Sequence, residues 1–258
     1  MAHSLSPAMQ NAALRAVGLT AWRYQLLPVP PQLVAETLRA LPAAGLRGVN
    51  VTIPHKAAAL AVATDPSPRA RVIGAANTLV YRADGAIAAD NTDAPALVEA
   101  LERLRPGSGP PATALVLGAG GSARAAVWAL RDTGVAEVRV WNRTPERARA
   151  LAGELGARAV AAPAPAELLV NCTAVGLDGD DPFGPLGLEA TDLASYGVVV
   201  DYVYTRSGTR LVDAARAAGV PAIDGLELLV AQGALAFTQF TGRPAPEETM
   251  REAARSAP

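Results

Sequence analysis

Short runs of β-branched and other apolar residues alternate along this chain with alanine-rich segments whose apolar positions recur every three or four residues. The first pattern is typical of buried strands and the second of amphipathic helices. Near the N-terminus the pattern predicts a helix from Ser6 to about Gly18, with Ser6 as its N-cap and Pro7 at its first position. Further along it predicts strands over residues 24–29 and 46–53 and helices over residues 31–41 and 55–63.

The same reading continues to the C-terminus. Residues 77–90 contain the turn pair Asp84-Gly85 between two extended runs, which predicts a hairpin, and a helix is expected from about Ala94 to Leu104. Residues 105–111, rich in proline, glycine and serine, read as a linker. Strand and helix patterns then alternate from residue 113 to about residue 204, and two helices are expected over residues 226–240 and 246–255.

This alternation predicts an α/β protein built around parallel sheets. We expect an N-terminal α/β substrate-binding domain over residues 1–104 and a Rossmann-type dinucleotide-binding domain over residues 105–224. We also expect a C-terminal helical segment over residues 225–258.

A glycine-rich turn follows the first strand of the second domain. Its glycines fall in the pattern Gly-x-Gly-x-x-Ala at Gly118, Gly120 and Ala123, after an apolar strand and before a helix. Gly118 permits a tight turn, Gly120 lets the backbone approach a pyrophosphate, and Ala123 allows close helix packing. Such a turn also occurs where nothing binds, but its strand–turn–helix context favours a dinucleotide cofactor.

The end of the next strand indicates which dinucleotide is bound. An NAD site carries an acidic residue there for the ribose hydroxyls. Here Asn142, Arg143 and Thr144 occupy the strand end, and Arg147 follows one turn into the next helix. Guanidinium groups suit a 2′-phosphate, so the sequence favours NADP over NAD.

Composition excludes several other classes of protein. The formal net charge is −1, which gives no sign of a nucleic-acid or anionic-membrane surface. One cysteine, Cys172, and two histidines make a disulfide or a metal site unexpected. No apolar run approaches the roughly 20 residues that span a bilayer, and the N-terminus lacks a signal-peptide pattern. We therefore expect a soluble cytoplasmic protein with small-molecule ligands, whose oligomeric state, monomer or homodimer, stays open.

Nine short motifs in order resemble the shikimate dehydrogenase family, the NADP-dependent enzymes of aromatic amino-acid and chorismate biosynthesis. They are HSLSP (3–7), NVTIPHK (50–56), GAANTLV (74–80), NTD (91–93), GAGGSARA (118–125), NRTPERA (142–148), NCTAVGL (171–177), DYVY (201–204) and GLELLVAQGALAF (225–237). The resemblance spans essentially the whole chain. It implies that the C-terminal helical segment, residues 225–258, returns to the first domain and that the active site lies in the cleft between the two domains. It implies an oxidoreductase that reversibly reduces 3-dehydroshikimate to shikimate.

The resemblance also implies roles for matching residues. Ser4 and Ser6, assisted by Tyr204, would hold the substrate carboxylate, and Lys56 and Asp93 would form the catalytic pair. The substrate hydroxyls would be held by Thr52, Asn77, Asp93 and Gln232. The cofactor segments would comprise Gly118, Ala119, Gly120, Gly121, Ser122, Asn142, Arg143, Thr144 and Arg147, with Tyr202 and Gly225 at the nicotinamide end.

The implied chemistry suits a lysine beside a carboxylate. A lysine ammonium can donate a proton and stabilise charge on a substrate oxygen. Desolvation favours its neutral form and an adjacent carboxylate favours its charged form, so the two groups are best treated as one coupled pair.

Three other functions and one departure from the family stay open. The alternatives are a quinate/shikimate dehydrogenase that uses NAD, a non-catalytic sensor that binds shikimate or NADP, and a methylenetetrahydrofolate-type dehydrogenase. The family usually has a short strand before HSLSP, whereas only Met1 and Ala2 precede His3 here. We hypothesise that the natural start lies upstream.

Overall fold

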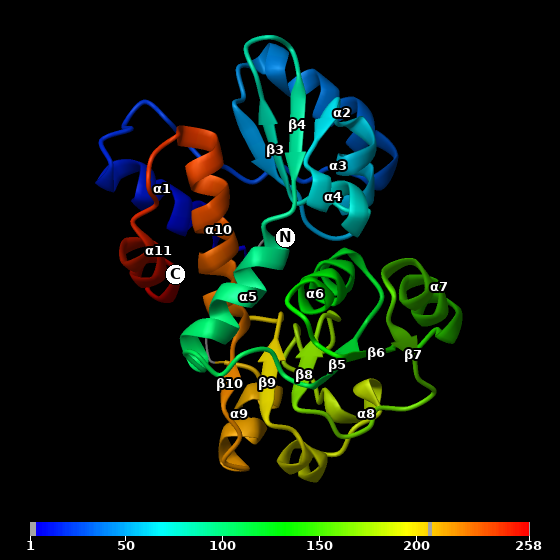
Figure 1. The fold of residues 1–258 in the computed structure, drawn as a ribbon. Coiled ribbons are helices and arrows are strands. Elements are labelled where there is room, and N and C mark those ends of the chain that lie inside the picture. The colour runs from blue at the N-terminus through cyan, green and yellow to red at the C-terminus, as the bar shows by residue number, and fades with distance from the viewer. Residues whose placement is uncertain (1–3, 206–207, 258) are drawn as a thin grey trace. The chain divides into compact units, whose positions relative to one another are not determined.

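A computed structural model describes residues 4–205 and 208–257 of the chain (Figure 1). Its contacts divide the chain into two compact units. Unit 1 comprises Met1–Thr92 and Leu229–Pro258, and unit 2 comprises Asp93–Leu228. The C-terminal helices therefore belong with the N-terminal part of the chain.

Unit 1 contains a mixed four-stranded sheet in the order β1-β3-β4-β2. Its strands are β1 (Gly48–Asn50), β2 (Asp65–Pro66), β3 (Thr78–Tyr81) and β4 (Ile87–Asp90). Strands β3 and β4 pair antiparallel, with Thr78 opposite Asp90 and Tyr81 opposite Ile87, which confirms the predicted hairpin. The tip is a tight turn in which Gly85 has a φ of +86°.

The helices of unit 1 come from both ends of the chain. They are α1 (Ser6–Ala16), η1 (Pro31–Leu33), α2 (Val34–Ala40), η2 (Leu41–Ala44), α3 (Lys56–Val62), α4 (Pro68–Ile73), most of α10 (Gly225–Thr241) and α11 (Glu247–Arg255). Apolar side chains of α2 and α3 pack with those of β3 and β4 in one core. Helix α11 packs against α1.

Two predictions near the N-terminus are wrong. Residues 24–29 do not form a strand, because the N–H and C=O of Tyr24 bind the Asn11 amide at 2.8 Å each and Pro28 has no N–H for a ladder. Ser6 is not the N-cap of α1 but its first residue; Leu5 occupies the cap position without a side-chain cap.

Unit 2 contains a six-stranded sheet in the order β10-β9-β8-β5-β6-β7, and every recorded pairing in it is parallel. Its strands are β5 (Thr113–Leu117), β6 (Glu137–Trp141), β7 (Arg158–Ala159), β8 (Leu168–Asn171), β9 (Val198–Asp201) and β10 (Ala222–Ile223). This is the doubly wound order of a Rossmann sheet. The strand order reverses between β5 and β8, where such sheets bind ligands at the carboxyl ends of their strands.

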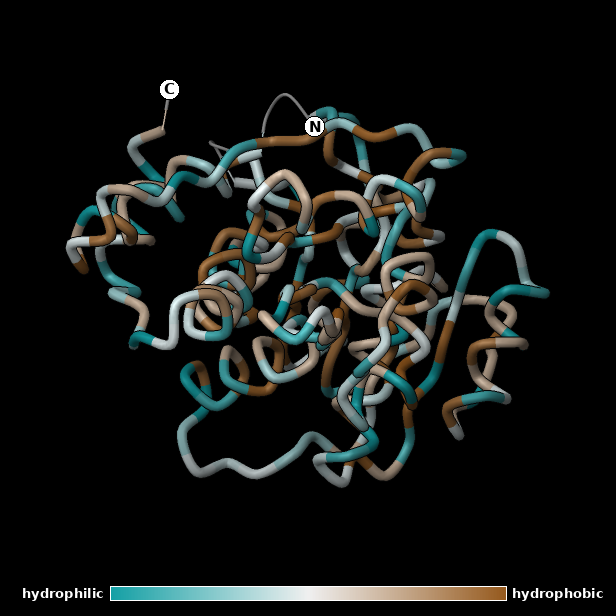
Figure 2. Tube along the Cα trace, turned by 90° about the horizontal axis from the view of Figure 1, so that it is seen from above, coloured by the Kyte–Doolittle hydropathy of each residue, from teal (hydrophilic) through white to brown (hydrophobic). Residues whose placement is uncertain are grey.

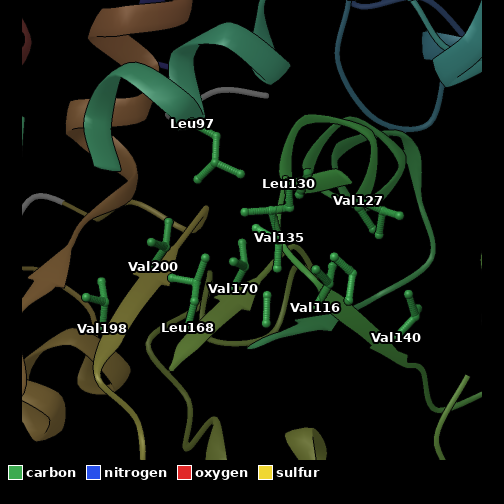
Figure 3. Close-up of a cluster of buried hydrophobic side chains, with 14 of the residues drawn as sticks. Leu97, Val116, Val127, Leu130, Val135, Val140, Leu168, Val170, Val198 and Val200 are labelled. Atoms are coloured by element: carbon green, nitrogen blue, oxygen red, sulfur yellow. The ribbon is translucent and has the colours of Figure 1, made fainter. Parts of the chain in front are cut away.

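Both faces of this sheet are buried. Val116, Val170 and Val200 point to one face and pack with apolar residues of α5 (Asp93–Leu104), α6 (Gly121–Asp132) and α7 (Pro145–Leu155) (Figure 3). Leu117, Leu169 and Val199, one position along the strands, point to the opposite face. There they pack with α8 (Phe183–Leu186), η3 (Ala190–Ser195) and α9 (Arg210–Ala217). The apolar runs of these strands follow from burial on both faces.

Helix α5 belongs to unit 2 by its contacts. It packs against α6 of the same unit, so the compact unit starts at Asp93, while the linker expected at residues 105–111 follows this helix. Hydrophilic and hydrophobic stretches alternate along the Cα trace (Figure 2). Among the described residues, no helix combines the length and apolar character needed to cross a bilayer.

Candidate active site

Unit 1 contains a cluster of buried polar side chains around Asn77. Asn77 is 2% exposed and Thr92 is fully buried. The Asn77 amide oxygen accepts hydrogen bonds from the backbone N–H of Thr92 at 2.7 Å and from its hydroxyl at 3.2 Å. Thr78 and Asn50 extend the cluster, because Asn50 Nδ2 donates to Thr78 Oγ1 at 3.2 Å. Amides and hydroxyls that satisfy one another are held in fixed positions, which suits recognition of a polyhydroxylated ligand.

Helix α10 supplies Gln232 to this cluster. Asn77 Nδ2 donates to Gln232 Oε1 at 3.4 Å. On α1, Gln10 donates from Nε2 to the carbonyl oxygen of Gly233 at 2.9 Å, which holds α1 against the same stretch of α10. Ser6 precedes Gln10 by one helical turn and therefore lies on the same side of α1.

Lys56 lies beside the cluster. It begins α3 and is 9% exposed. Its carbonyl oxygen accepts a hydrogen bond from the N–H of Ala76 at 2.9 Å, and the N–H of Val51 donates to the carbonyl oxygen of Asn77 at 2.8 Å. The turn over residues 51–56 therefore closes around Ala76 and Asn77. A helix N-terminus is electrostatically unfavourable for a structural cation, so a purely structural role does not explain this lysine.

Lys56 is also the one lysine among the 23 lysine and arginine residues of the chain. Many of the arginines take part in ion pairs, as in Arg69–Asp90 and Arg82–Asp65. A guanidinium keeps its proton, whereas an ammonium can release one. The one lysine of this set, which can release its proton, lies at a buried position.

The remaining predicted residues of unit 1 lie at the starts of helices. The Ser4 hydroxyl accepts a hydrogen bond from the N–H of Ser6 at 3.4 Å, and both serines are half-buried. Thr52 is exposed in the turn before α3. His3, the first residue of the HSLSP motif, lies outside the described residues.

Asp90 supports this region from the end of β4. It accepts hydrogen bonds from Ser67 Oγ at 2.6 Å, from Arg69 Nε at 2.8 Å and from Gln239 Nε2 at 2.7 Å. Burial alone would raise the pKa of the Asp90 carboxyl, but the hydrogen bonds from Arg69 and Ser67 and the charge of Arg69 hold it below its usual value. The next residue is Asn91, so this ion pair fixes the strand end that leads into the NTD motif.

In unit 2 the glycine turn joins β5 to α6 at the point where the strand order reverses. Gly118 has a φ of +110°, and a Cβ there would lie 3.2 Å from Thr173 Cγ2. Gly120 is exposed, and a Cβ on it would meet no atom within 4 Å, so its surroundings are open to a ligand. Helix α6 has no acidic residue in its first turn. Residues Gly118, Ala119, Gly120, Gly121 and Ser122 thus form a turn that fits a pyrophosphate on a helix N-terminus.

The end of β6 forms a second turn. Asn142 Nδ2 donates to the carbonyl oxygen of Thr144 at 2.9 Å, which fixes the backbone between them. Thr144 is the N-cap residue of α7, but its side chain makes no cap hydrogen bond. Its hydroxyl is therefore not used by the helix that it begins.

Two arginines at this turn differ in their ion pairing from a third arginine on α7. Arg143 and Arg147 are exposed, and within residues 4–205 and 208–257 neither takes part in an ion pair. Arg149 on the same helix pairs with Glu146 at 2.5 Å. Glu146 is thereby engaged by an arginine, and two guanidinium groups remain for a phosphate.

The last predicted residues of unit 2 lie at its helix starts and beyond β9. Asp93 begins α5 and is 7% exposed, and Tyr204 is half-buried. A Cβ on Gly225 would lie 2.5 Å from the carbonyl oxygen of Val203, so only glycine fits there. The Tyr202 hydroxyl is buried with no hydrogen-bond partner among the described residues. Burial, reinforced by Cys172 and Asp93, raises the pKa of Tyr202 well above its usual value.

Three polar residues near these sites have no role in the sequence predictions, although two of them lie within the quoted motifs. They are Thr78 and Asp201, which are buried, and Asp90, which is half-buried, each at an end of a strand. The two aspartates follow the apolar runs Ile87–Ala89 and Val198–Val200. A charged residue directly after an apolar strand is the sequence feature that could have predicted them.

Three family models match the chain. The shikimate dehydrogenase substrate-binding domain matches residues 1–79. The shikimate/quinate 5-dehydrogenase model matches residues 103–172. The shikimate 5′-dehydrogenase C-terminal domain matches residues 225–255.

Similar proteins and structures agree with these matches. Shikimate dehydrogenase (NADP(+)) of a Thermus thermophilus strain is 47% identical over 100% of this chain and 95% of its own length. The enzyme of that name from Paracoccus denitrificans is 42% identical over 98% of this chain and 92% of its own. A crystal structure of a Thermus thermophilus shikimate 5-dehydrogenase in complex with NADP(H) and shikimate has a TM-score of 0.84 at 44% identity, covering 100% of this chain and 96% of that one.

One structural neighbour carries a different name. The 5-ketofructose reductase of a Gluconobacter strain has a TM-score of 0.82 at 29% identity, covering 96% of this chain and 92% of that one. The fold therefore also occurs in a ketose reductase. The family models and the identities over nearly full length nevertheless agree, and the chain belongs to the shikimate dehydrogenase family.

Proposed function

We propose that this chain catalyses the reversible, NADP-dependent reduction of 3-dehydroshikimate to shikimate. The observation that carries the proposal is Lys56, the one lysine of the chain, buried at the start of α3 beside the Asn77 cluster. A protein that only binds a hydroxylated acid needs hydrogen-bonding groups, but it has no need of a buried proton donor.

The substrate is held by short polar side chains in this proposal. The serine hydroxyls of Ser4 and Ser6, assisted by Tyr204, bind its carboxylate. The ring hydroxyls are bound by Thr52, Asn77, Asp93 and Gln232. The hydrogen bonds that fix Asn77 against Thr92 and Gln232 support this assignment, because a preorganised amide loses little entropy on binding.

Lys56 and Asp93 act together on the hydroxyl that is oxidised. Bound NADP supplies the nicotinamide that takes hydride from substrate C3. Lys56 takes the proton from the C3 oxygen in the oxidising direction, and its ammonium returns that proton in the reducing direction. Asp93 accepts a hydrogen bond from the substrate and balances the charge of the ammonium, so the two residues handle the proton as one pair.

The chain's cofactor contacts come from the two turns of unit 2. The backbone of residues 118–122 binds the pyrophosphate, while Asn142, Arg143, Thr144 and Arg147 bind the 2′-phosphate. Tyr202 and Gly225 lie at the nicotinamide end. Accordingly we assign substrate binding chiefly to residues 1–104 with the C-terminal helices, and cofactor binding to residues 105–224. We also propose a cytoplasmic location, where a single cysteine stays reduced.

The substrate is tested by initial rates of reduced-cofactor formation. The purified protein would be supplied with NADP and with shikimate, quinate or no substrate, and with NADPH and 5-ketofructose in the reverse direction. We expect shikimate to give the highest kcat/KM. Equal or higher kcat/KM with quinate or 5-ketofructose would replace the proposed substrate, and binding of NADP without any turnover would favour a sensor.

The cofactor is tested with the arginines beside β6. Each charge-assisted hydrogen bond is worth about 1.5–3 kcal/mol, so the Arg143→Ala/Arg147→Ala double variant, which removes two guanidinium groups, should raise the KM for NADP about 100-fold or more. Its KM for NAD should change little. Arg149→Ala is the matched control, because that exposed arginine is paired with Glu146 on the same helix. An equal effect of the double variant on both cofactors would refute 2′-phosphate recognition.

A further inference from the structure

A buried carboxylate, Asp201, connects several parts of the proposed cofactor site without belonging to any of them. Asp201 ends β9 and is fully buried. Its Oδ1 accepts hydrogen bonds from Asn171 Nδ2 at 2.9 Å and from the N–H of Val203 at 3.0 Å. Its Oδ2 accepts a hydrogen bond from Thr209 Oγ1 at 2.7 Å. One side chain thus joins the ends of β8 and β9 to the start of α9.

The first consequence concerns the segment after β9. Val203 lies between Tyr202 and Tyr204, and Thr209 is the N-cap of α9. Asp201 therefore holds this segment near its beginning and at its far end. Its backbone in turn shapes the start of α10, since the carbonyl oxygens of Tyr202 and Val203 occupy the space that a Cβ on Gly225 would need, at 2.7 and 2.5 Å.

The second consequence concerns the glycine turn. Asn171, which donates to Asp201, accepts hydrogen bonds on Oδ1 from the N–H and the hydroxyl of Thr173 at 3.1 and 2.8 Å. The Thr173 methyl group packs where a side chain on Gly118 would stand. The network around Asp201 thus reaches the end of β5 through β8. These are the strands between which the order reverses.

The carboxylate is a costly way to make these connections. Among the described residues no cation pairs with Asp201, and its three donors are an amide, a backbone N–H and a hydroxyl. Burial raises the pKa of Asp201 to about 6 against the opposing effect of those hydrogen bonds, and Asp224 adds to the rise. Groups whose ionisation is disfavoured in this way are concentrated at functional sites.

We propose that Asp201 is a positioning residue that sets the conformation of residues 202–205, Thr209 and Gly225, and thereby the nicotinamide half of the cofactor site and Tyr204. This inference rests on the proposed function for the identity of the ligands. The carboxylate accepts these three hydrogen bonds in fixed directions and donates none. Asp201 itself contacts neither substrate nor cofactor in this scheme.

The test compares two ligands that share one end. NADP carries the nicotinamide, whereas 2′,5′-ADP carries only the adenosine half with its two phosphates. For Asp201→Ala we expect a Kd for NADP and a KM for shikimate raised about 10-fold or more, the loss of roughly one charge-assisted hydrogen bond, with the Kd for 2′,5′-ADP within about twofold of wild type. Asp201→Asn, which retains two of the acceptor contacts, should recover most of both losses.

Leu193→Ala is the matched control for lost stability. Leu193 is fully buried in the core on the other side of the same sheet. The Leu193→Ala variant should lower the unfolding midpoint. It should not change the Kd for NADP relative to the Kd for 2′,5′-ADP. The proposal is overturned if Asp201→Ala weakens both ligands equally or behaves like Leu193→Ala. If Asp201→Ala fails to fold, Thr209→Val removes one donor, and the same split between NADP and 2′,5′-ADP is expected on a smaller scale.

The two binding measurements need no turnover, so they separate this inference from the proposed function. A wild type that binds NADP more tightly than 2′,5′-ADP but does not oxidise shikimate would refute the proposed substrate alone. The effect of Asp201 on the nicotinamide end of the cofactor site would still be tested by the Kd values of the variants for NADP and 2′,5′-ADP.

Discussion

Two aspartates occupy equivalent places in the two units and have opposite surroundings. Asp90 ends β4 of unit 1 and directly precedes the NTD motif, and Asp201 ends β9 of unit 2 and begins the DYVY motif. Asp90 is paired with Arg69. Asp201 has only neutral donors among the described residues.

The pKa values of the two carboxyls follow from this difference. Both are largely withdrawn from water, which favours the neutral acid. The Arg69 guanidinium and Ser67 outweigh burial at Asp90 and lower its pKa, whereas three neutral donors do not outweigh burial at Asp201, whose pKa rises to about 6. Position in the strand does not set the ionisation of an aspartate here; the nearby cation does. At neutral pH the charge of Asp90 therefore stabilises unit 1, and the charge of Asp201 costs unit 2 stability.

The same substitution should act oppositely at the two sites. Asp90→Asn would direct an N–H₂ group at the donors of Arg69 or Gln239 and remove the ion pair, so we expect a loss of about 3 kcal/mol at pH 7. Asp201→Asn removes a disfavoured charge and keeps the shape, so its free energy of unfolding should be equal to or above that of wild type. Urea unfolding at pH 7 measures both. Equal losses would contradict the contrast.

Two glycines of α10 extend the comparison to packing. A Cβ on Gly225 would meet backbone carbonyl oxygens at 2.5 and 2.7 Å, and one on Gly233 would meet the flexible end of Met9, its Cε at 2.5 Å. Overpacking against backbone that cannot shift should cost Gly225→Ala about 2–3 kcal/mol, while Gly233→Ala should cost about 1 kcal/mol. Thermal unfolding of the two variants measures both losses of stability. A larger loss in Gly233→Ala than in Gly225→Ala would show that the backbone at Gly225 adapts.

The pH dependence of stability separates the two carboxyls further. Unfolded Asp has a pKa of about 3.9. The contribution of Asp90 is present above that value and is lost as the pH falls through its lower folded pKa. The cost of Asp201 is absent near pH 4 and grows as the pH rises towards about 6.

The difference in unfolding free energy between Asp201→Asn and wild type should therefore grow from pH 4 to pH 6 and then level off. We expect a change on the order of 1–2 kcal/mol across this window. Urea titrations at several pH values would measure it. A difference that is constant with pH would show that Asp201 titrates at its ordinary value.

Two buried tyrosine hydroxyls give the smallest expected effect. Tyr81 in unit 1 donates from its hydroxyl to the carbonyl oxygen of Leu38 at 2.8 Å, whereas the Tyr202 hydroxyl in unit 2 has no partner among the described residues. Tyr81→Phe should cost about 1 kcal/mol, and Tyr202→Phe should be neutral or slightly stabilising in the absence of ligands. A clear loss of stability in Tyr202→Phe would reveal a partner for its hydroxyl.

Local sequence patterns predict much of this fold. The glycine turn at Gly118, the hairpin turn at Gly85 and the apolar strands of unit 2 are each specified within a few residues. The strand expected over residues 24–29 failed because a side chain 13 residues away, Asn11, takes the backbone groups of Tyr24. Competition from a distant side chain for these backbone groups cannot be predicted from a short stretch of sequence.

The supporting residues of the site are harder to predict for the same reason. The amide of Gln239 reaches Asp90 across 149 residues of sequence, and Asp201 is bound by residues on two other elements. The motifs indicate which residues meet a ligand, but the residues that hold them in place depend on partners that only the fold brings together. The assignments to substrate and cofactor themselves remain predictions.

The central claim is that Lys56 transfers a proton, and Lys56→Arg tests it most directly, because the other 22 of the 23 lysine and arginine residues are arginine. The measurement is kcat for NADP-dependent shikimate oxidation, with Arg82→Lys as the control at an exposed ion pair. We predict that kcat of Lys56→Arg falls about 100- to 10,000-fold while NADP still binds, since a guanidinium keeps the charge but not the proton transfer. A kcat within a few-fold of wild type would contradict the claim.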